Sequence, residues 1–155
     1  MLPDEARLQD ARAWLAKAQL DLRAAAHEMN SPSESLWGDV MFHAQQAAGK
    51  SMKAFLAYHD VPFRKTHSLE ELGRQCVELD AMLAPVAAQA APLTEYAWKF
   101  RYPGDADEPD RTEAEEALTA ARIVCNAILS RLPQNALPPG AENPSAGPDD
   151  RSGQR

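Results

Sequence analysis

One uninterrupted stretch, residues 37–60, places the strongest constraint on the fold. It reads WGDVMFHAQQAAGKSMKAFLAYHD, and it distributes small and large apolar side chains around most of a helical circumference. Small side chains let neighbouring helices approach closely, whereas large apolar side chains need contacts on several sides. We therefore predict a central helix that is surrounded by other helices.

The polar residues of this stretch share one side of the predicted helix. At 100° per residue, six positions lie within an arc of about 80°. They are Asp39, His43, Gln46, Lys50, Lys53 and Ala57. The pattern predicts a narrow polar stripe along an otherwise buried helix, and this stripe is the first candidate for a functional surface.

Apolar residues recur at three- and four-residue steps in four further regions. They predict a first helix over residues 3–29, a short helix from residue 69, a helical segment over residues 81–100 and a last helix that reaches residue 132. In the first helix, the charged residues between the apolar ones, Asp21 among them, are expected to face solvent.

Turn and capping residues separate these segments. Ser68 stands three residues before Glu71, and Thr112 stands three residues before Glu115, which is the spacing of a capping box. Pro92 is expected to kink or divide the segment over residues 81–100.

The chain end differs in composition from the rest. Residues 134–155 are rich in Pro, Gly and polar residues, so we predict a disordered tail after a domain formed by residues 1–133. No segment has the period of a strand. The predicted fold class is all-α, an antiparallel up-and-down bundle of four to six helices.

Composition narrows the range of functions. The net charge of −7 argues against a protein that coats nucleic acid, because phosphate contacts need clustered cations. Cys76 and Cys125 match no metal-ligand spacing, and we expect free, buried thiols.

The sequence has no signal peptide and no stretch of about 18 apolar residues, so we expect a soluble, cytoplasmic protein. It has no Gly-rich phosphate loop and no paired metal ligands, so no metal or cofactor is predicted.

Four segments occur in an order that is typical of one family. WLAKAQLDLRAA, FHAQQAAGKSMKAFL, THSLEEL and YAWKFRYPG together resemble bacterial HEPN domains over about residues 11–133. The resemblance implies an antiparallel helical bundle that is often dimeric. Many members are encoded beside a minimal nucleotidyltransferase, with which they form a two-component or toxin–antitoxin system. Some members are metal-independent ribonucleases, others are thought to bind nucleotides, and one branch carries a DNA-binding label.

The ribonuclease members of the family use an Arg that is followed, after four to six residues, by a His near the last helix. Neither Arg101 nor Arg111 is followed by a His at that distance, and all four histidines precede residue 70. The sequence therefore favours a protein without this catalytic activity.

Several residues could bind a phosphate or a base through imidazole, amide, hydroxyl, ammonium and guanidinium groups. The candidate ligand-binding residues are His43, Gln46, Lys50, Lys53, Thr66, His67, Arg101 and Tyr102. The alternatives are structural. The lysines could extend to solvent, Thr66 could only cap a helix, and Arg101 could pair with a carboxylate on a neighbouring helix. The stripe could equally form a dimer interface.

Three functions follow from these residues and from the resemblance. The first is a non-catalytic HEPN domain that forms a homodimer, binds a nucleotide or nucleic-acid phosphate and is the partner of a nucleotidyltransferase. The second is a ribonuclease toxin with a non-standard site, in which His43 or His67 acts as general acid or base and Arg101 stabilises charge. The third is a purely structural dimerisation module.

Overall fold

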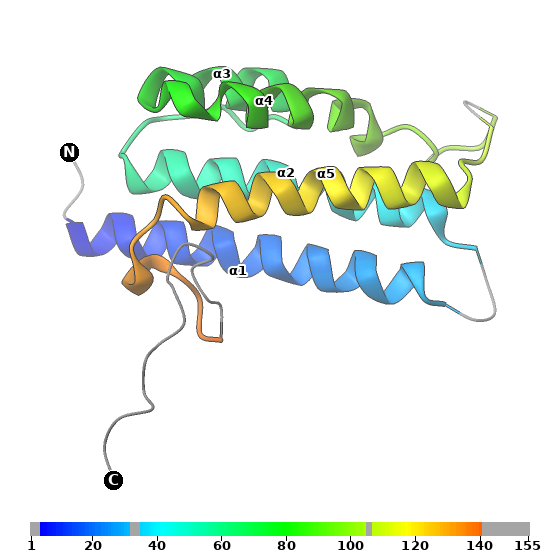
Figure 1. Ribbon diagram of the computed structural model, residues 1–155, viewed down its shortest axis with the longest axis horizontal. Helices are drawn as coiled ribbons and strands as arrows, with labels where there is room; N and C mark the ends of the chain where they lie inside the picture. The colour runs from blue at the N-terminus through cyan, green and yellow to red at the C-terminus, as the bar shows by residue number, and fades with distance from the viewer. Residues whose placement is uncertain (1–3, 32–34, 105–106, 141–155) are drawn as a thin grey trace, which may run out of the picture.

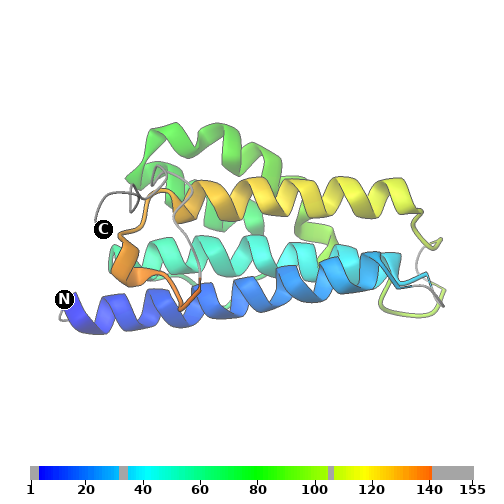
Figure 2. The same cartoon turned by 60° about the horizontal axis from the view of Figure 1, so that its bottom comes forward.

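The computed structural model describes residues 4–31, 35–104 and 107–140. Helix α1 (Asp4–Met29) runs along the long axis of the molecule, α2 (Trp37–Tyr58) returns beside it, and α5 (Arg111–Leu129) runs in the same direction as α2 (Figure 1 and Figure 2). Helices α3 (Leu69–Leu79) and α4 (Ala84–Ala90) lie on the side of α2 and α5 that is remote from α1. The described residues contain no strand, and the predicted all-α antiparallel bundle is confirmed.

Helix α2 is the centre of the bundle, as its sequence predicts. It packs against α1, α3 and α5 and against the 3₁₀ helix η2 (Ala91–Ala97). Its small residues are fully buried where neighbouring helices approach: Ala44, Ala47, Ala48 and Ala54 are all 0% exposed. Met41, Met52 and Leu56 supply the large side chains that fill the spaces between the helices.

The two cysteines lie inside the bundle as free thiols, as predicted. Ser51 on α2 donates a hydrogen bond of 3.0 Å to the sulfur of Cys125 on α5. Burial raises the pKa of the thiols of Cys76 and Cys125 to about 12 in each case. Both cysteines therefore act as small apolar core residues rather than as nucleophiles.

Two prolines divide the segment that the sequence predicts over residues 81–100. The chain forms a 3₁₀ turn η1 (Ala81–Leu83), then α4, then η2, and Pro85 and Pro92 each stand in the first turn of a new piece. A proline lacks the amide hydrogen that a continuous helix needs, but it fits the first turn. The expected division at Pro92 is confirmed.

The capping predictions were correct in one place and wrong in another. The hydroxyl of Ser68 accepts a hydrogen bond from the amide of Glu71, although the reciprocal bond of a capping box is not formed. Helix α5 begins earlier than predicted, because Asp110 rather than Thr112 is its cap. Asp110 and Glu113 exchange both bonds of a capping box. An aspartate accepts the amide hydrogen as well as a threonine does, so spacing alone could not choose between them.

The packed chain extends beyond Pro133, where the sequence predicts a disordered tail. Residues 134–136 form the 3₁₀ turn η3 (Gln134–Ala136), in which Ala136 is 0% exposed, and the following Leu137 is 5% exposed. Arg12 of α1 donates a hydrogen bond to the carbonyl oxygen of Asn135 and so holds the segment against the bundle. The predicted start of the tail was therefore too early. Residues 141–155, which the same prediction covers, lie outside the described residues.

A helix that crosses a membrane must be both long and apolar. Within residues 4–31, 35–104 and 107–140, none of the helices combines the length and the apolar character that a membrane-crossing segment requires.

Candidate functional site

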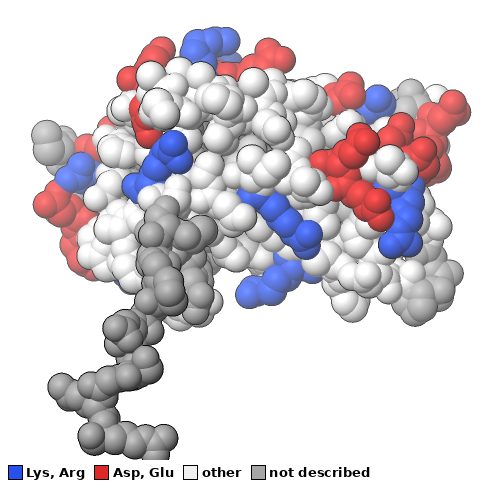
Figure 3. All heavy atoms as spheres, viewed as in Figure 1, with Lys and Arg blue, Asp and Glu red and all other residues white. Residues whose placement is uncertain are grey.

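Charged side chains are unevenly distributed over the surface. Acidic side chains gather over the start of α5, on the face shown in Figure 3. The exposed acids of this region are Asp110, Glu113, Glu115 and Glu116. The polar stripe of α2 belongs to another part of the molecule, between α1 and the loop that precedes α3.

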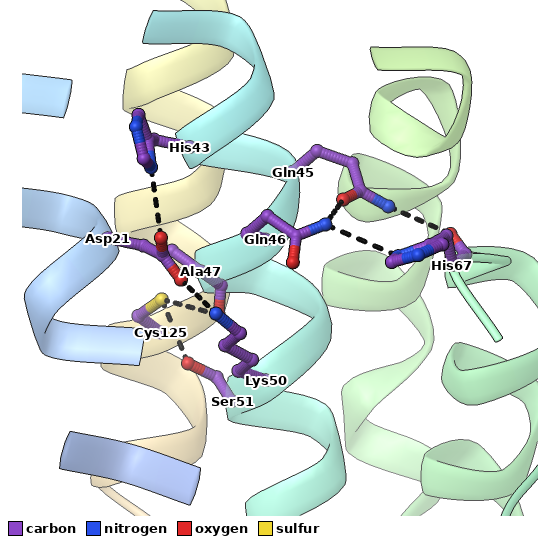
Figure 4. Close-up of polar contacts among 9 residues, drawn as sticks. All are labelled: Asp21, His43, Gln45, Gln46, Ala47, Lys50, Ser51, His67 and Cys125. Atoms are coloured by element: carbon purple, nitrogen blue, oxygen red, sulfur yellow. Dashed lines mark hydrogen bonds and ion pairs between the residues drawn. The ribbon is translucent and has the colours of Figure 1, made fainter. Parts of the chain in front are cut away.

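A buried carboxylate organises the middle of the stripe. Asp21 of α1 accepts a 2.9 Å hydrogen bond at Oδ1 from Nδ1 of His43 and a 2.6 Å bond at Oδ2 from the ammonium of Lys50 (Figure 4). The expectation that Asp21 faces solvent was wrong, because its side chain is only 12% exposed. The other ring nitrogen of His43, Nε2, lies 3.4 Å from a carboxylate oxygen of Glu28.

The environment of this cluster shifts the pKa values of Asp21, His43 and Glu28. Burial alone would raise the pKa of Asp21, but the hydrogen bonds from His43 and Lys50 outweigh it and lower that pKa. The hydrogen bond to Asp21 raises the pKa of His43 above 6.5 despite partial burial. Burial raises the pKa of Glu28, one of whose oxygens is buried without a hydrogen-bond partner. The cluster thus favours an imidazolium held between two carboxylates.

The raised pKa of His43 gives the stability of the protein a predictable pH dependence. Its contribution is complete below the unfolded pKa of 6.5 and disappears as the pH rises through the higher folded value. We expect the wild type to exceed His43→Gln in free energy of unfolding by about 1.5 kcal/mol near pH 5, because a charged hydrogen bond is lost, and by less near pH 9. Urea denaturation at the two pH values measures both differences.

His59 provides a control of opposite sign. Burial, and then the charge of Arg7, lowers the pKa of His59 below 6.5. Protonation of His59 is therefore less favourable in the folded than in the unfolded state, so this residue destabilises the fold as the pH falls. The advantage of the wild type over His59→Gln is therefore expected to decrease towards low pH. If the His43→Gln difference instead grew with rising pH, the assignment of an imidazolium between Asp21 and Glu28 would be wrong.

A second group of polar residues on α2 meets the loop before α3. Gln45 donates a 2.8 Å hydrogen bond to the backbone oxygen of His67, and Gln46 lies 3.3 Å from Nδ1 of the same residue (Figure 4). Together with Lys50, Lys53 and Thr66, these residues line a crevice, which we call the α2 crevice. Its volume is about 10 Å³, which is space for a single water molecule.

Lys53 is the cation of the α2 crevice that lacks an acidic partner in the described part of the chain. Its ammonium lies 5.1 Å from the ring centroid of Trp14 and 6.0 Å from that of Phe63, and these rings meet edge to face. Burial, and then the charge of Lys50, lowers its pKa. Aromatic faces replace only part of the lost hydration of an ammonium, so an anion that arrived here would gain a strong interaction.

Three backbone amides at the start of α3 already have acceptors within the chain. The amide of Ser68 donates to the hydroxyl of Thr66, and the amide of Leu69 donates to the hydroxyl of Thr94. The amide of Glu71 is bound by Ser68. Thr66 therefore serves as a local acceptor, and the anion-binding capacity of this helix start is largely used by the chain itself.

Arg101 and Tyr102 lie apart from the residues of the α2 crevice. The guanidinium of Arg101 stacks 3.8 Å from the ring centroid of Phe42, and Tyr102 is 64% exposed. Lys53 follows Phe42 by eleven positions along α2, a rise of roughly 16 Å. The structure thus brings Gln46, Lys50, Lys53, Thr66 and His67 together at the α2 crevice. His43 and Arg101 lie outside the crevice, and both contact the ring of Phe42.

Sequence reasoning missed the residues that organise the site from α1. Asp21 and Trp14 are seven residues apart and therefore lie on the same face of α1. They bind Lys50 and Lys53, which lie on one side of α2. An aspartate and a tryptophan that share a helix face opposite two lysines were a signal that could have been used. Among the residues described, no group of three or more His, Cys, Asp or Glu is arranged to hold a metal ion.

Comparison with known proteins agrees with this architecture. The crystal structure of TT1696 from Thermus thermophilus superimposes with a TM-score of 0.65 and 26% sequence identity, covering 79% of this chain and 98% of that one. Curated proteins provide no match. The family model described as "HEPN domain" matches residues 11–132, which include α1 from Ala11 onwards and all of the α2 crevice. The chain therefore belongs to the HEPN domain family.

Proposed function

We propose that this HEPN domain is a non-catalytic binding protein that recognises a phosphate group of a nucleotide or nucleic acid at the α2 crevice. The observation that carries the proposal is the ammonium of Lys53, which is partly desolvated over two aromatic rings and has no acidic partner among the described residues. A phosphate oxygen would supply the charge-assisted hydrogen bond that this group lacks.

The size of the α2 crevice defines how such a ligand would bind. Space for one water molecule excludes an enclosed nucleotide, so the phosphate would lie at the mouth of the crevice, over Lys53 and His67. The rest of the ligand would extend over the surface. Lys50 contributes less than its charge suggests, because Asp21 already neutralises it at 2.6 Å. This arrangement fits one phosphate of a short or terminal segment rather than a long duplex.

The net charge of the protein also favours a ligand that presents a single phosphate over a long duplex. The net charge of −7 repels an extended polyanion, whereas a single local cation can still bind one phosphate. The acidic region over the start of α5 (Figure 3) would oppose a duplex that continued across that face.

The contacts of His43 argue against a catalytic role for this residue. A general acid or base needs a ring nitrogen that can reach the substrate. Carboxylates face both ring nitrogens of His43, at 2.9 and 3.4 Å. Arg101, the residue that the ribonuclease hypothesis requires for charge stabilisation, is stacked on Phe42 and does not line the α2 crevice where His67 lies. These contacts favour binding over the alternative of a ribonuclease with a non-standard site.

Substitution of Lys53 by methionine tests the proposal. Lys53→Met retains an unbranched apolar stem over Trp14 and Phe63 but removes the charge. We expect it to weaken binding of a 5′-phosphorylated RNA trinucleotide by at least about tenfold, measured by isothermal titration calorimetry, because one charge-assisted hydrogen bond is lost. Melting temperatures of the variants establish that they are folded.

The matched control is Lys65→Met, which removes an exposed lysine from the neighbouring loop. Its affinity is expected to remain within about twofold of the wild type, since an exposed cation away from the phosphate contributes little. Equal affinities of Lys53→Met and the wild type, or equal binding of the trinucleotide with and without its 5′-phosphate, would refute the assignment.

Membership of the HEPN family extends the proposal to partners. We infer a homodimer and a minimal nucleotidyltransferase as the protein partners, as the family resemblance implies. Light scattering coupled to size-exclusion chromatography tests the homodimer. Mixing the protein with a nucleotidyltransferase encoded beside its gene tests the second partner, and separate elution of the two proteins at micromolar concentration would contradict it.

A further inference from the structure

A larger pocket lies at the opposite end of α2 from the loop that carries Arg101. Three segments that are far apart in the sequence form it: the start of α1, the end of α2 and the chain that follows Pro133, all at one end of the bundle (Figure 1 and Figure 2). Its volume is about 460 Å³, which falls within the range of pockets that bind small molecules. We call it the terminal pocket.

The wall formed by Pro133 and Asn135 distinguishes the terminal pocket from the rest of the domain. The HEPN family model ends at residue 132, so this wall lies beyond the matched region. Arg12 donates a hydrogen bond to the carbonyl oxygen of Asn135 in this wall, and the next two residues, Ala136 and Leu137, are buried. Part of the lining of the terminal pocket therefore lies outside the region that the family model matches.

Arg7 is the principal charged group of the terminal pocket. It pairs with Asp4, whose side chain is 87% exposed, and its Nε is buried without a hydrogen-bond partner. An ion pair with so exposed a carboxylate contributes little, so a better-placed anion can replace Asp4. A guanidinium can bind a carboxylate or phosphate through two parallel hydrogen bonds.

The other lining residues provide flat and apolar surfaces. Leu8, Tyr58 and Pro133 are half-buried around the pocket, and the ring of His59 meets that of Tyr58 at a centroid distance of 5.1 Å. Such walls suit an aromatic or heteroaromatic ring. A metal ion is a poor candidate, because Asp4 and His59 are the only side chains of the lining that commonly bind one.

We propose that the terminal pocket binds a small organic anion, in which a flat ring carries a carboxylate or a phosphate and Arg7 binds the anionic group. The ring packs against Leu8, Tyr58 and Pro133, and His59 lies at the rim. This site is independent of the α2 crevice, which lies between α2 and the loop before α3.

His59 provides a specific signal of binding. Burial and the charge of Arg7 lower its pKa, and Asp80 opposes them. An anion bound to Arg7 adds negative charge near the ring, so it should raise the pKa of His59. Nuclear magnetic resonance of the imidazole protons, assigned with His59→Gln, follows this change in the full-length protein.

The test uses four probes that separate ring from charge. Adenosine 5′-monophosphate and benzoate carry both, adenosine carries only the ring, and inorganic phosphate carries only the charge. We expect the first two, or one of them, to raise the pKa of His59 and to bind at least about tenfold more tightly than adenosine and phosphate. Failure of both to bind at millimolar concentration would overturn the proposal.

Variants locate the binding. Arg7→Gln is expected to weaken binding at least about tenfold, whereas Arg23→Gln, an exposed arginine of the same helix, should have no effect. Asn135→Asp places a repelling charge at the rim and should weaken binding without altering the core. Equal affinity in Arg7→Gln and Arg23→Gln would refute the role of Arg7.

Lys53→Met separates this proposal from that of the α2 crevice. This variant should bind the same probes with unchanged affinity. If Lys53→Met instead failed to bind them, the ligand would lie at the α2 crevice, so the two proposals can fail separately.

Discussion

The substitution Asp21→Ala is expected to lower the free energy of unfolding by about 3 kcal/mol. The carboxylate of Asp21 is the common partner of His43 and Lys50, and the three side chains are only 12%, 26% and 25% exposed, respectively. Removing Asp21 leaves the ammonium of Lys50 without its partner in a poorly hydrated space, and His43 keeps only the contact of its Nε2 with Glu28. Breaking such a pair costs more than forming it contributes, because the remaining charge stays desolvated.

Urea denaturation at neutral pH measures this loss. Asp10→Ala, which removes an exposed carboxylate from the same helix, is the matched control and should change stability by less than about 0.5 kcal/mol. A second substitution tests the cause. Because Lys50→Met removes the unpaired charge, the double variant Asp21→Ala/Lys50→Met should be more stable than Asp21→Ala alone. An equal or lower stability of the double variant would mean that unpaired charge is not responsible.

The substitution Ala48→Leu is expected to lower the free energy of unfolding by about 2–3 kcal/mol, close to the effect of removing Asp21. Ala48 is 0% exposed and belongs to the core cluster that α2 forms with the surrounding helices. Three additional carbon atoms at this position must displace a neighbouring helix or adopt a strained rotamer. Alanine and leucine are both good helix formers, so the loss reports packing and not helix propensity.

Ala57→Leu is the control, because Ala57 is only half-buried near the end of the same helix. Its stability should remain within about 0.5 kcal/mol of the wild type. Thermal and urea denaturation of the two variants give the comparison. If Ala48→Leu were as stable as Ala57→Leu, the close approach of helices around α2 would not depend on small residues.

The sequence predicted the fold well because the fold depends on local patterns. The periodic apolar residues of α1, α2 and α5 define which faces are buried, and prolines end or divide helices through their own geometry. Helix starts were less certain. Several residues near Asp110 can cap a helix, and their spacing alone does not choose among them.

The candidate site was predictable only in part. The residues of one helix face follow from periodicity, so Gln46, Lys50 and Lys53 were found together. Which partners meet them depends on the rotation of α1 against α2, which no local pattern specifies. The pairing of Asp21 with Lys50, and the stacking of Lys53 on Trp14, therefore emerged only from the packed structure.

The segment after Pro133 was misjudged for a related reason. Its composition resembles that of a disordered tail, yet burial of Ala136 and Leu137 is enough to fix it when α1 supplies a complementary surface. Composition measures the average tendency of a segment to remain unfolded, and a few well-placed apolar contacts can override that average.

The bond between Arg12 and Asn135 also has a consequence for the order of folding. It joins residues that are 123 positions apart in the chain, so it closes a loop that contains almost the entire domain. During synthesis, α1 and α2 can pair early, whereas the first turns of α1 receive their last partner only after the final segment has left the ribosome. Contacts of such long sequence separation form late because the entropy of closing the loop must be overcome first. The beginning of the chain is therefore among the last parts of the domain to reach its native packing.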